Sequence, residues 1–167
     1  MIKNVCFSFT SGLTRPHHVF VWILNDANVN DQTKNPFLYD TFSVSTNPRV
    51  ITNAYLEVGN NYKYPENAYN VSTEMSRVYR DVLEYVHANN DFKGGTVLTR
   101  ENFSSLYPFL YFNLEYQKPD IKDGTTKLTF HYKLDGATTT DYKVYALVLY
   151  EQNLEIIQSN GKLLLRA

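Results

Sequence analysis

The sequence contains one stretch with the spacing of an α-helix, at residues 73–88. Apolar residues recur there at steps of three and four, which gathers their side chains on one face of a helix. Ser72 or Thr73 is expected to cap the start through its hydroxyl group, and Glu74 suits the positive end of the helix dipole. The apolar face comprises Met75, Val78, Tyr79, Val82, Leu83 and Val86, and a solvated face is expected from Arg77, Arg80, Asp81 and Glu84, with ion pairs Arg77/Asp81 and Arg80/Glu84.

Most of the remaining chain alternates apolar and polar residues, which is typical of β-strands. Residues 17–24 are apolar on both faces, which predicts a buried central strand. Segments rich in Asn and Pro predict loops at Asn25–Pro36 and Asn60–Asn70. Strands are expected at residues 2–10, 17–24, 37–45, 49–59, 105–116, 127–134 and 141–151, and in a final hairpin of 155–158 and 162–165. In the strand at 127–134, the residues expected to face inward are Leu128, Phe130, Tyr132 and Leu134.

Short strands separated by turn signals predict an antiparallel sandwich, and a jelly roll of eight strands in two sheets fits the count. Alternation alone does not separate the jelly roll from other sandwiches. A chain of 167 residues has the length for one substantial core. The predicted fold is therefore mainly β, an antiparallel jelly-roll sandwich of about eight strands with one inserted α-helix over residues 73–88, in a single domain spanning residues 1–167.

Composition narrows the classes of function and location. The net charge is −1 and the 16 basic residues are spread along the chain, so direct nucleic-acid binding is not expected. The single cysteine, Cys6, cannot form an internal disulfide, which favours a reducing compartment such as the cytosol or nucleus. Neither a membrane span nor a classical export signal is expected, because no apolar run is long enough.

The sequence offers no catalytic, metal or cofactor residues. A nucleophile elbow and a paired Cys and His are both missing, so Cys6 is interpreted as structural and the chain as not an enzyme. The four histidines are His17, His18, His87 and His131. Adjacent strand residues such as His17 and His18 should point to opposite faces, which argues against a shared metal.

Three tyrosines in the predicted loop before the helix are the candidate interface residues: Tyr62, Tyr64 and Tyr69. Aromatic residues are enriched in protein interfaces, and 15% of this chain is aromatic. Exposed tyrosines here would stack on a sugar, as in a lectin-like jelly roll, or would pack under their own loop. The second alternative is favoured.

A series of short motifs resembles the C-terminal region of double jelly-roll major capsid proteins, especially those of Maverick/Polinton elements and adintovirus-like DNA viruses. The resemblance extends from about Thr14 to Glu151. Its motifs, in order, are Arg15-Pro16-His17-His18-Val19-Phe20-Val21-Trp22, Asn35-Pro36-Phe37 with Asp40-Thr41-Phe42, Leu56-Glu57-Val58-Gly59-Asn60 with Tyr64-Pro65-Glu66, Tyr79-Arg80-Asp81, Asn90-Asp91 with Gly95-Thr96, and Ser105-Leu106-Tyr107-Pro108 with Tyr111-Phe112.

The resemblance implies a structural virion protein that assembles through subunit interfaces. Family members stand two jelly rolls side by side, form trimers and tile an icosahedral shell together with other capsid proteins. The implied location is the virion, assembled in the host cytoplasm or nucleus. This chain has the length of one jelly roll, so self-association, with a trimer expected, or pairing with a second jelly-roll domain would be needed to cover its side wall.

A carbohydrate- or receptor-binding jelly-roll module is the alternative function. It would use the tyrosines at Tyr62, Tyr64 and Tyr69 as stacking surfaces.

Overall fold

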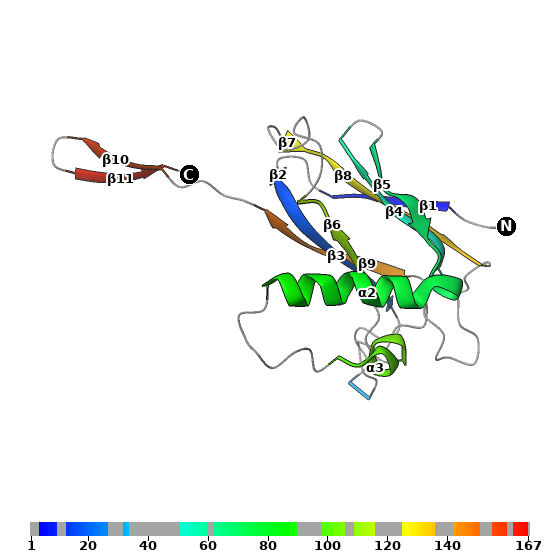
Figure 1. The fold of residues 1–167 in the computed structure, drawn as a ribbon. Coiled ribbons are helices and arrows are strands. Elements are labelled where there is room, and N and C mark those ends of the chain that lie inside the picture. Colours follow the sequence, from blue (N-terminus) through cyan, green and yellow to red (C-terminus); the bar gives the residue numbers. More distant parts are fainter. Residues whose placement is uncertain are drawn as a thin grey trace.

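The computed structural model describes residues 4–9, 13–26, 32–33, 51–59, 62–89, 98–105, 109–115, 125–135, 142–150, 155–159 and 162–166 (Figure 1). Within these residues the fold is mainly β, with two larger antiparallel sheets and few helices, which is consistent with a β-sandwich. The predicted strand at residues 37–45 and most of the predicted loop at Asn25–Pro36 lie outside the described residues.

The larger sheet has four strands in the order β1-β8-β4-β5, and the second has three in the order β6-β3-β9. Two further pairs form small ribbons, β2 with β7 and β10 with β11. The strands are β1 (Asn4–Ser8), β2 (Leu13–Thr14), β3 (Pro16–Asn25), β4 (Ile51–Val58), β5 (Tyr62–Tyr69), β6 (Leu110–Asn113), β7 (Thr125–Thr126), β8 (Leu128–Leu134), β9 (Tyr142–Tyr150), β10 (Glu155–Ser159) and β11 (Lys162–Arg166).

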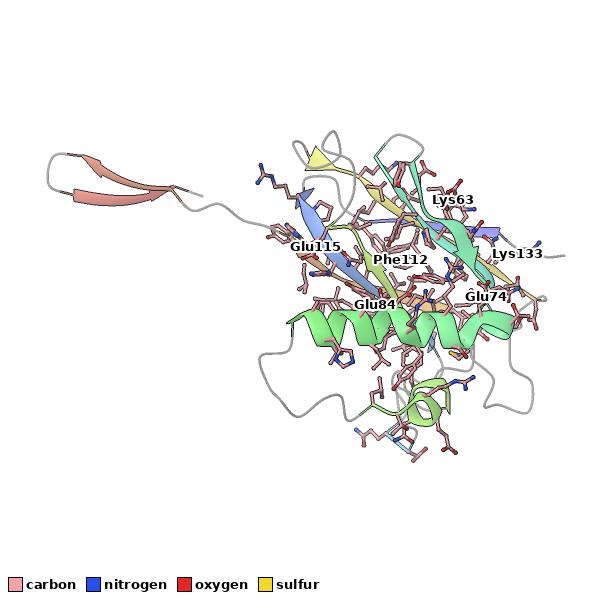
Figure 2. The ribbon with its side chains drawn as sticks, viewed as in Figure 1. Lys63, Glu74, Glu84, Phe112, Glu115 and Lys133 are labelled. Atoms are coloured by element: carbon pink, nitrogen blue, oxygen red, sulfur yellow. The ribbon has the colours of Figure 1, made fainter. Side chains whose placement is uncertain are left out.

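The inward faces of the two sheets meet through aromatic and branched side chains. The ring of Phe112 in β6 lies 6.1 Å from the ring of Phe130 in β8, edge to face. Figure 2 shows Phe112 in the interior, above the helix at residues 71–89. The predicted central position of residues 17–24 is confirmed, as is the predicted inward face of β8, whose four residues Leu128, Phe130, Tyr132 and Leu134 are all buried.

One position in β4 departs from simple alternation. Asn53, Tyr55 and Glu57 are half-buried, as their side of the strand predicts, whereas Ile51 is completely buried. The register with β8 shifts between Ile51 and Asn53, and such a shift turns the following side chains to the other face.

The predicted helix is confirmed as α2 (Val71–Asn89). Its N-terminal cap is Asn70 instead of the predicted Ser72 or Thr73, because the Asn70 carbonyl accepts a hydrogen bond from the Glu74 N–H and its side chain accepts one from the Ser72 N–H. The Glu74 carboxylate accepts a bond in return from the Asn70 N–H, at 3.3 Å. This reciprocal arrangement satisfies backbone donors that a helix start otherwise leaves unpaired.

The predicted loop at Asn60–Asn70 is wrong for most of its length, because Tyr62–Tyr69 form strand β5. Pro65 lacks an N–H, but β5 is an edge strand of the described sheet, where a missing ladder donor is tolerated. The register with β4 also shifts between Ala54 and Leu56, which obscures the alternation.

A second helix was not expected from the sequence. It is α3 (Arg100–Ser105), and its Phe103 is completely buried, with its ring 5.4 Å from the ring of Tyr79 in α2. The predicted strand at 105–116 is correspondingly shorter, since β6 spans only Leu110–Asn113. Neither described helix is long and apolar enough to cross a membrane.

Candidate functional site

A cleft of about 500 Å³ lies where α2 crosses the edge strands β5 and β6. It is lined by residues of all three elements, and the three tyrosines proposed from the sequence are among them. The lining comprises Tyr62, Tyr64, Pro65 and Tyr69 from β5, Arg77, Arg80, Asp81 and Glu84 from α2, and Tyr111 and Asn113 from β6.

Tyr69 lies at the base of this cleft and connects its three walls. Its hydroxyl group donates a hydrogen bond to Asp81 Oδ2 at 2.5 Å and lies 3.3 Å from the Tyr111 carbonyl oxygen. The ring is buried against Phe112, with ring centroids 5.5 Å apart, and the Arg77 guanidinium lies over it at 4.9 Å. Burial, and then the hydrogen bond to Asp81, raise the pKa of Tyr69 far above its usual range, so this hydroxyl stays protonated and acts as a donor.

Tyr62 and Tyr64 form the β5 side of the cleft, and both are half-buried against the core. Burial raises the pKa of Tyr64, and the negative charge of Asp81 acts in the same direction. Tyr69 is buried, so it is not the exposed stacking residue that the first alternative requires. The favoured alternative, packing under their own loop, is wrong as stated, because residues 62–69 form strand β5 and the tyrosines pack against the core. Their role in an interface stays a prediction.

The charged residues of α2 do not form the simple solvated face that was expected. The Asp81 side chain is only 19% exposed, because it turns toward Tyr69 and also lies 3.2 Å from Arg80.

Of the two ion pairs expected on this helix, the pair of Arg77 with Asp81 is replaced. Arg77 pairs with Glu74 at 3.2 Å and donates to the Asn67 carbonyl at 3.0 Å. The expected Arg80 and Glu84 pair is present, at 3.6 Å.

His18 lies behind the β6 wall of the cleft. Its Nδ1 is 2.9 Å from the Tyr111 hydroxyl oxygen and its Nε2 is 3.4 Å from Glu115 Oε1. Both contacts are satisfied by a neutral ring that carries its proton on Nε2, with the Tyr111 hydroxyl donating to Nδ1. Burial lowers the pKa of His18, the Glu115 carboxylate opposes this effect, and His17 adds to it.

The expectation that His17 and His18 are kept apart by strand alternation is wrong in one respect. His17 Nδ1 is 3.8 Å from the same Glu115 oxygen that His18 approaches, and the register of β3 with β9 is irregular between Pro16 and His18. Even so, the described part of the chain contains no group of three or more His, Cys, Asp or Glu side chains that could hold a metal ion.

A second hollow, of about 410 Å³, lies on the outer face of the four-stranded sheet. Cys6 in β1 is the register partner of His131 in β8, and both residues line the hollow. The His131 ring is stacked on Tyr55 at 4.7 Å, and its Nε2 is 3.0 Å from Glu57 Oε2. Sequence reasoning missed this Cys and His pair, because the two residues are far apart in the chain and only the β1-β8 register brings them together.

Comparisons of this chain with family models, with curated proteins and with solved structures found no match.

Replacing Tyr69 with Phe should destabilise the protein by about 1.5–3 kcal/mol, the range for a hydrogen bond to a charged group. The substitution keeps the ring and its packing but leaves Asp81 without its buried donor. Chemical denaturation measures the change in the free energy of unfolding. Tyr62→Phe is the matched control and should change stability by less than about 0.5 kcal/mol. Equal stabilities for Tyr69→Phe and the wild-type protein would show that the contact with Asp81 contributes nothing.

Stability should fall as the pH drops below about 6.5, the pKa of histidine in an unfolded chain. The lowered pKa of His18 in the fold means that the unfolded chain takes up a proton there first, so acid favours unfolding. His18→Gln should make the free energy of unfolding less dependent on pH between about 5 and 7. His17→Gln removes only the smallest of the effects that lower the pKa of His18, so it should change the slope less than His18→Gln does. Identical slopes for all three proteins would rule out this role for His18.

Proposed function

We propose that this chain is a jelly-roll domain of the capsid type, a structural protein that works by assembling through subunit interfaces and carries out no chemical step. Two antiparallel sheets packed face to face are what such a domain requires. The described residues supply seven strands to these sheets, four to one and three to the other. The order of motifs that resembles double jelly-roll capsid proteins supports the same proposal.

The observation that carries the proposal is an exposed apolar side on β9. Leu147 and Leu149 are 49% and 37% exposed, and Tyr150 beside them is also exposed. Leu147 is the register partner of Phe20 in β3, so it lies on the sheet face that packs against Tyr85 of α2, beyond the area that the helix covers. Neighbouring exposed apolar side chains on a sheet edge are suited to contact with another subunit.

Under this proposal the partners are further copies of the chain, a second jelly-roll domain and other capsid proteins. The expected assembly is a trimer, the location is the virion, and assembly takes place in the host cytoplasm or nucleus. Pairing through β9 would bury the apolar side that a single jelly roll leaves open.

Light scattering coupled to size-exclusion chromatography should find a trimer or a larger closed assembly whose population rises with protein concentration. Electron microscopy then tests for shells. Leu147→Lys combined with Leu149→Lys should shift the protein toward monomer, because charged groups resist burial in a contact. Phe7→Lys is the matched control, since Phe7 is equally exposed but lies on β1. A monomer at every concentration would overturn the proposal, and unchanged assembly of the double variant would exclude this surface.

The tyrosine-lined cleft favours a second candidate function, carbohydrate or receptor binding. It combines four tyrosine rings with two guanidinium groups, two carboxylates and an amide, and sugars are bound by such stacking surfaces and planar hydrogen-bonding groups. On a glycan array, selective binding should be lost in Tyr62→Ala and in Tyr64→Ala. Tyr55→Ala, on the outer sheet face, should retain it. An array with no selective binding would argue against this function.

A further inference from the structure

We propose that Cys6 is a site of reversible thiol modification, at which a small disulfide that carries carboxylate groups, such as glutathione disulfide, exchanges onto the thiol inside the hollow of the four-stranded sheet. The modification is independent of the proposed assembly, which uses the other sheet. Cys6 is the single cysteine of the chain and it is exposed. The hollow that it lines has a volume of about 410 Å³, which gives an attached group a place to lie.

His131 is placed beside Cys6 to act as a base. The two residues are directly opposite in the β1-β8 register, and opposite residues of an antiparallel pair carry their Cβ atoms about 5 Å apart on one face of the sheet. On the other side of His131, the Tyr55 ring is stacked on the imidazole at 4.7 Å, with the two planes 5° apart. Glu57 Oε2 lies 3.0 Å from His131 Nε2. A carboxylate only accepts, so Nε2 carries the hydrogen and Nδ1 keeps a lone pair that can take the proton of a thiol.

Lys133 supplies a positive charge to the same hollow (Figure 2). It is the register partner of Asn4, two residues before Cys6, so it is a diagonal neighbour of the thiol. The attacking species in thiol chemistry is the thiolate, and reactive cysteines are found in electropositive, partly exposed surroundings. Lys133 and the Asn53 amide, which also lines the hollow, provide donors for the carboxylates of an incoming molecule. The hollow therefore combines a thiol, a base and a binding group for an anion.

The exchange needs no reactant other than the disulfide. His131 Nδ1 takes the proton of the Cys6 thiol, and the resulting thiolate attacks one sulfur of glutathione disulfide. A bond forms between Cys6 Sγ and that sulfur, the original S–S bond breaks, and the second glutathione leaves as a thiolate with the electron pair of the broken bond. The proton held by His131 then passes to this departing thiolate. Cys6 is thereby oxidised and the released glutathione is reduced, and an excess of free glutathione reverses the reaction.

The first experiment measures, by intact-mass spectrometry at near-neutral pH and low salt, how fast the full chain gains one glutathione from glutathione disulfide. A synthetic peptide of residues 1–10 is the reference, because it carries the same thiol without the hollow. Both are also treated with hydroxyethyl disulfide, which is uncharged. The full chain should react faster than the peptide with both reagents, and its preference for the charged reagent should exceed that of the peptide by about fivefold, the effect of a single surface charge. Added salt should reduce this preference. A full chain that reacts no faster than the peptide, or that shows no greater preference for the charged reagent, would overturn the proposal.

A second experiment assigns the effect to the two side chains of the hollow. His131→Gln should slow the exchange with both reagents, because the base is removed. Lys133→Gln should slow the reaction with glutathione disulfide more than the reaction with hydroxyethyl disulfide, because the charge that favours the anion is removed. Lys127→Gln is the matched control, since Lys127 is exposed just before β8 and does not line the hollow, and it should react as the wild-type chain does. Melting temperatures establish that each variant is folded. If folded His131→Gln and Lys133→Gln both react like Lys127→Gln, the proposal is wrong.

Discussion

The fold depends on how helix α2 is attached across the edges of two sheets. Two sheets that pack face to face leave an open side, and here α2 crosses the side where β5 and β6 lie. Tyr69 makes this attachment specific, because its ring packs on Phe112 of β6 while its hydroxyl group binds Asp81 of α2. A half-buried carboxylate is costly to leave without a donor, so this arrangement fixes the position of the helix along its length as well as its distance from the sheets.

The same attachment explains why a cleft exists here. Asp81 is drawn inward and Arg77 is held over the Tyr69 ring, so the polar face of α2 forms one wall above the β5 and β6 tyrosines. Tyr111 then links this cleft to His18 and Glu115 behind it, which are held by hydrogen-bonding contacts of 2.9 and 3.4 Å. The cleft and the polar cluster are thus consequences of one packing arrangement, and a change at Tyr69 should be felt in both.

Periodicity in the sequence predicted the parts of the fold in which one face is simply buried. Helix α2 and the alternating strand β8 are of this kind. Strand β3 was also predictable, because both of its faces are apolar and this pattern is typical of a central strand. The missed features arise where local and tertiary signals conflict. The sequence of strand β5 contains Pro65 and has the composition of a loop. The register shift in its pairing with β4 also hides the alternation, so only that pairing identifies it as a strand.

Contacts between distant segments could not be predicted from one sequence. The sequence singles out Tyr62, Tyr64 and Tyr69, yet their convergence with Arg80 and Glu84 in a cleft depends on where α2 crosses β5. Helix spacing places Asp81 on the polar face, which predicts a solvated carboxylate, whereas the hydrogen bond from the Tyr69 hydroxyl group turns it inward and leaves it half-buried. The pairing of Cys6 with His131 likewise requires the β1-β8 register.

The two candidate surfaces differ in how far their groups are already satisfied. In the cleft, Arg77 and Arg80 have carboxylate partners and Asp81 has the Tyr69 hydroxyl, so a polar ligand would have to compete with existing contacts. On β9, Leu147 and Leu149 are about half and more than a third exposed, respectively. Full burial of such a side chain is worth about 1.5–3 kcal/mol, so covering what remains exposed would contribute on the order of 1 kcal/mol at each leucine, before any backbone pairing. Several such contacts repeated around a closed ring would reinforce one another, and this difference supports the proposal of assembly over the proposal of ligand binding.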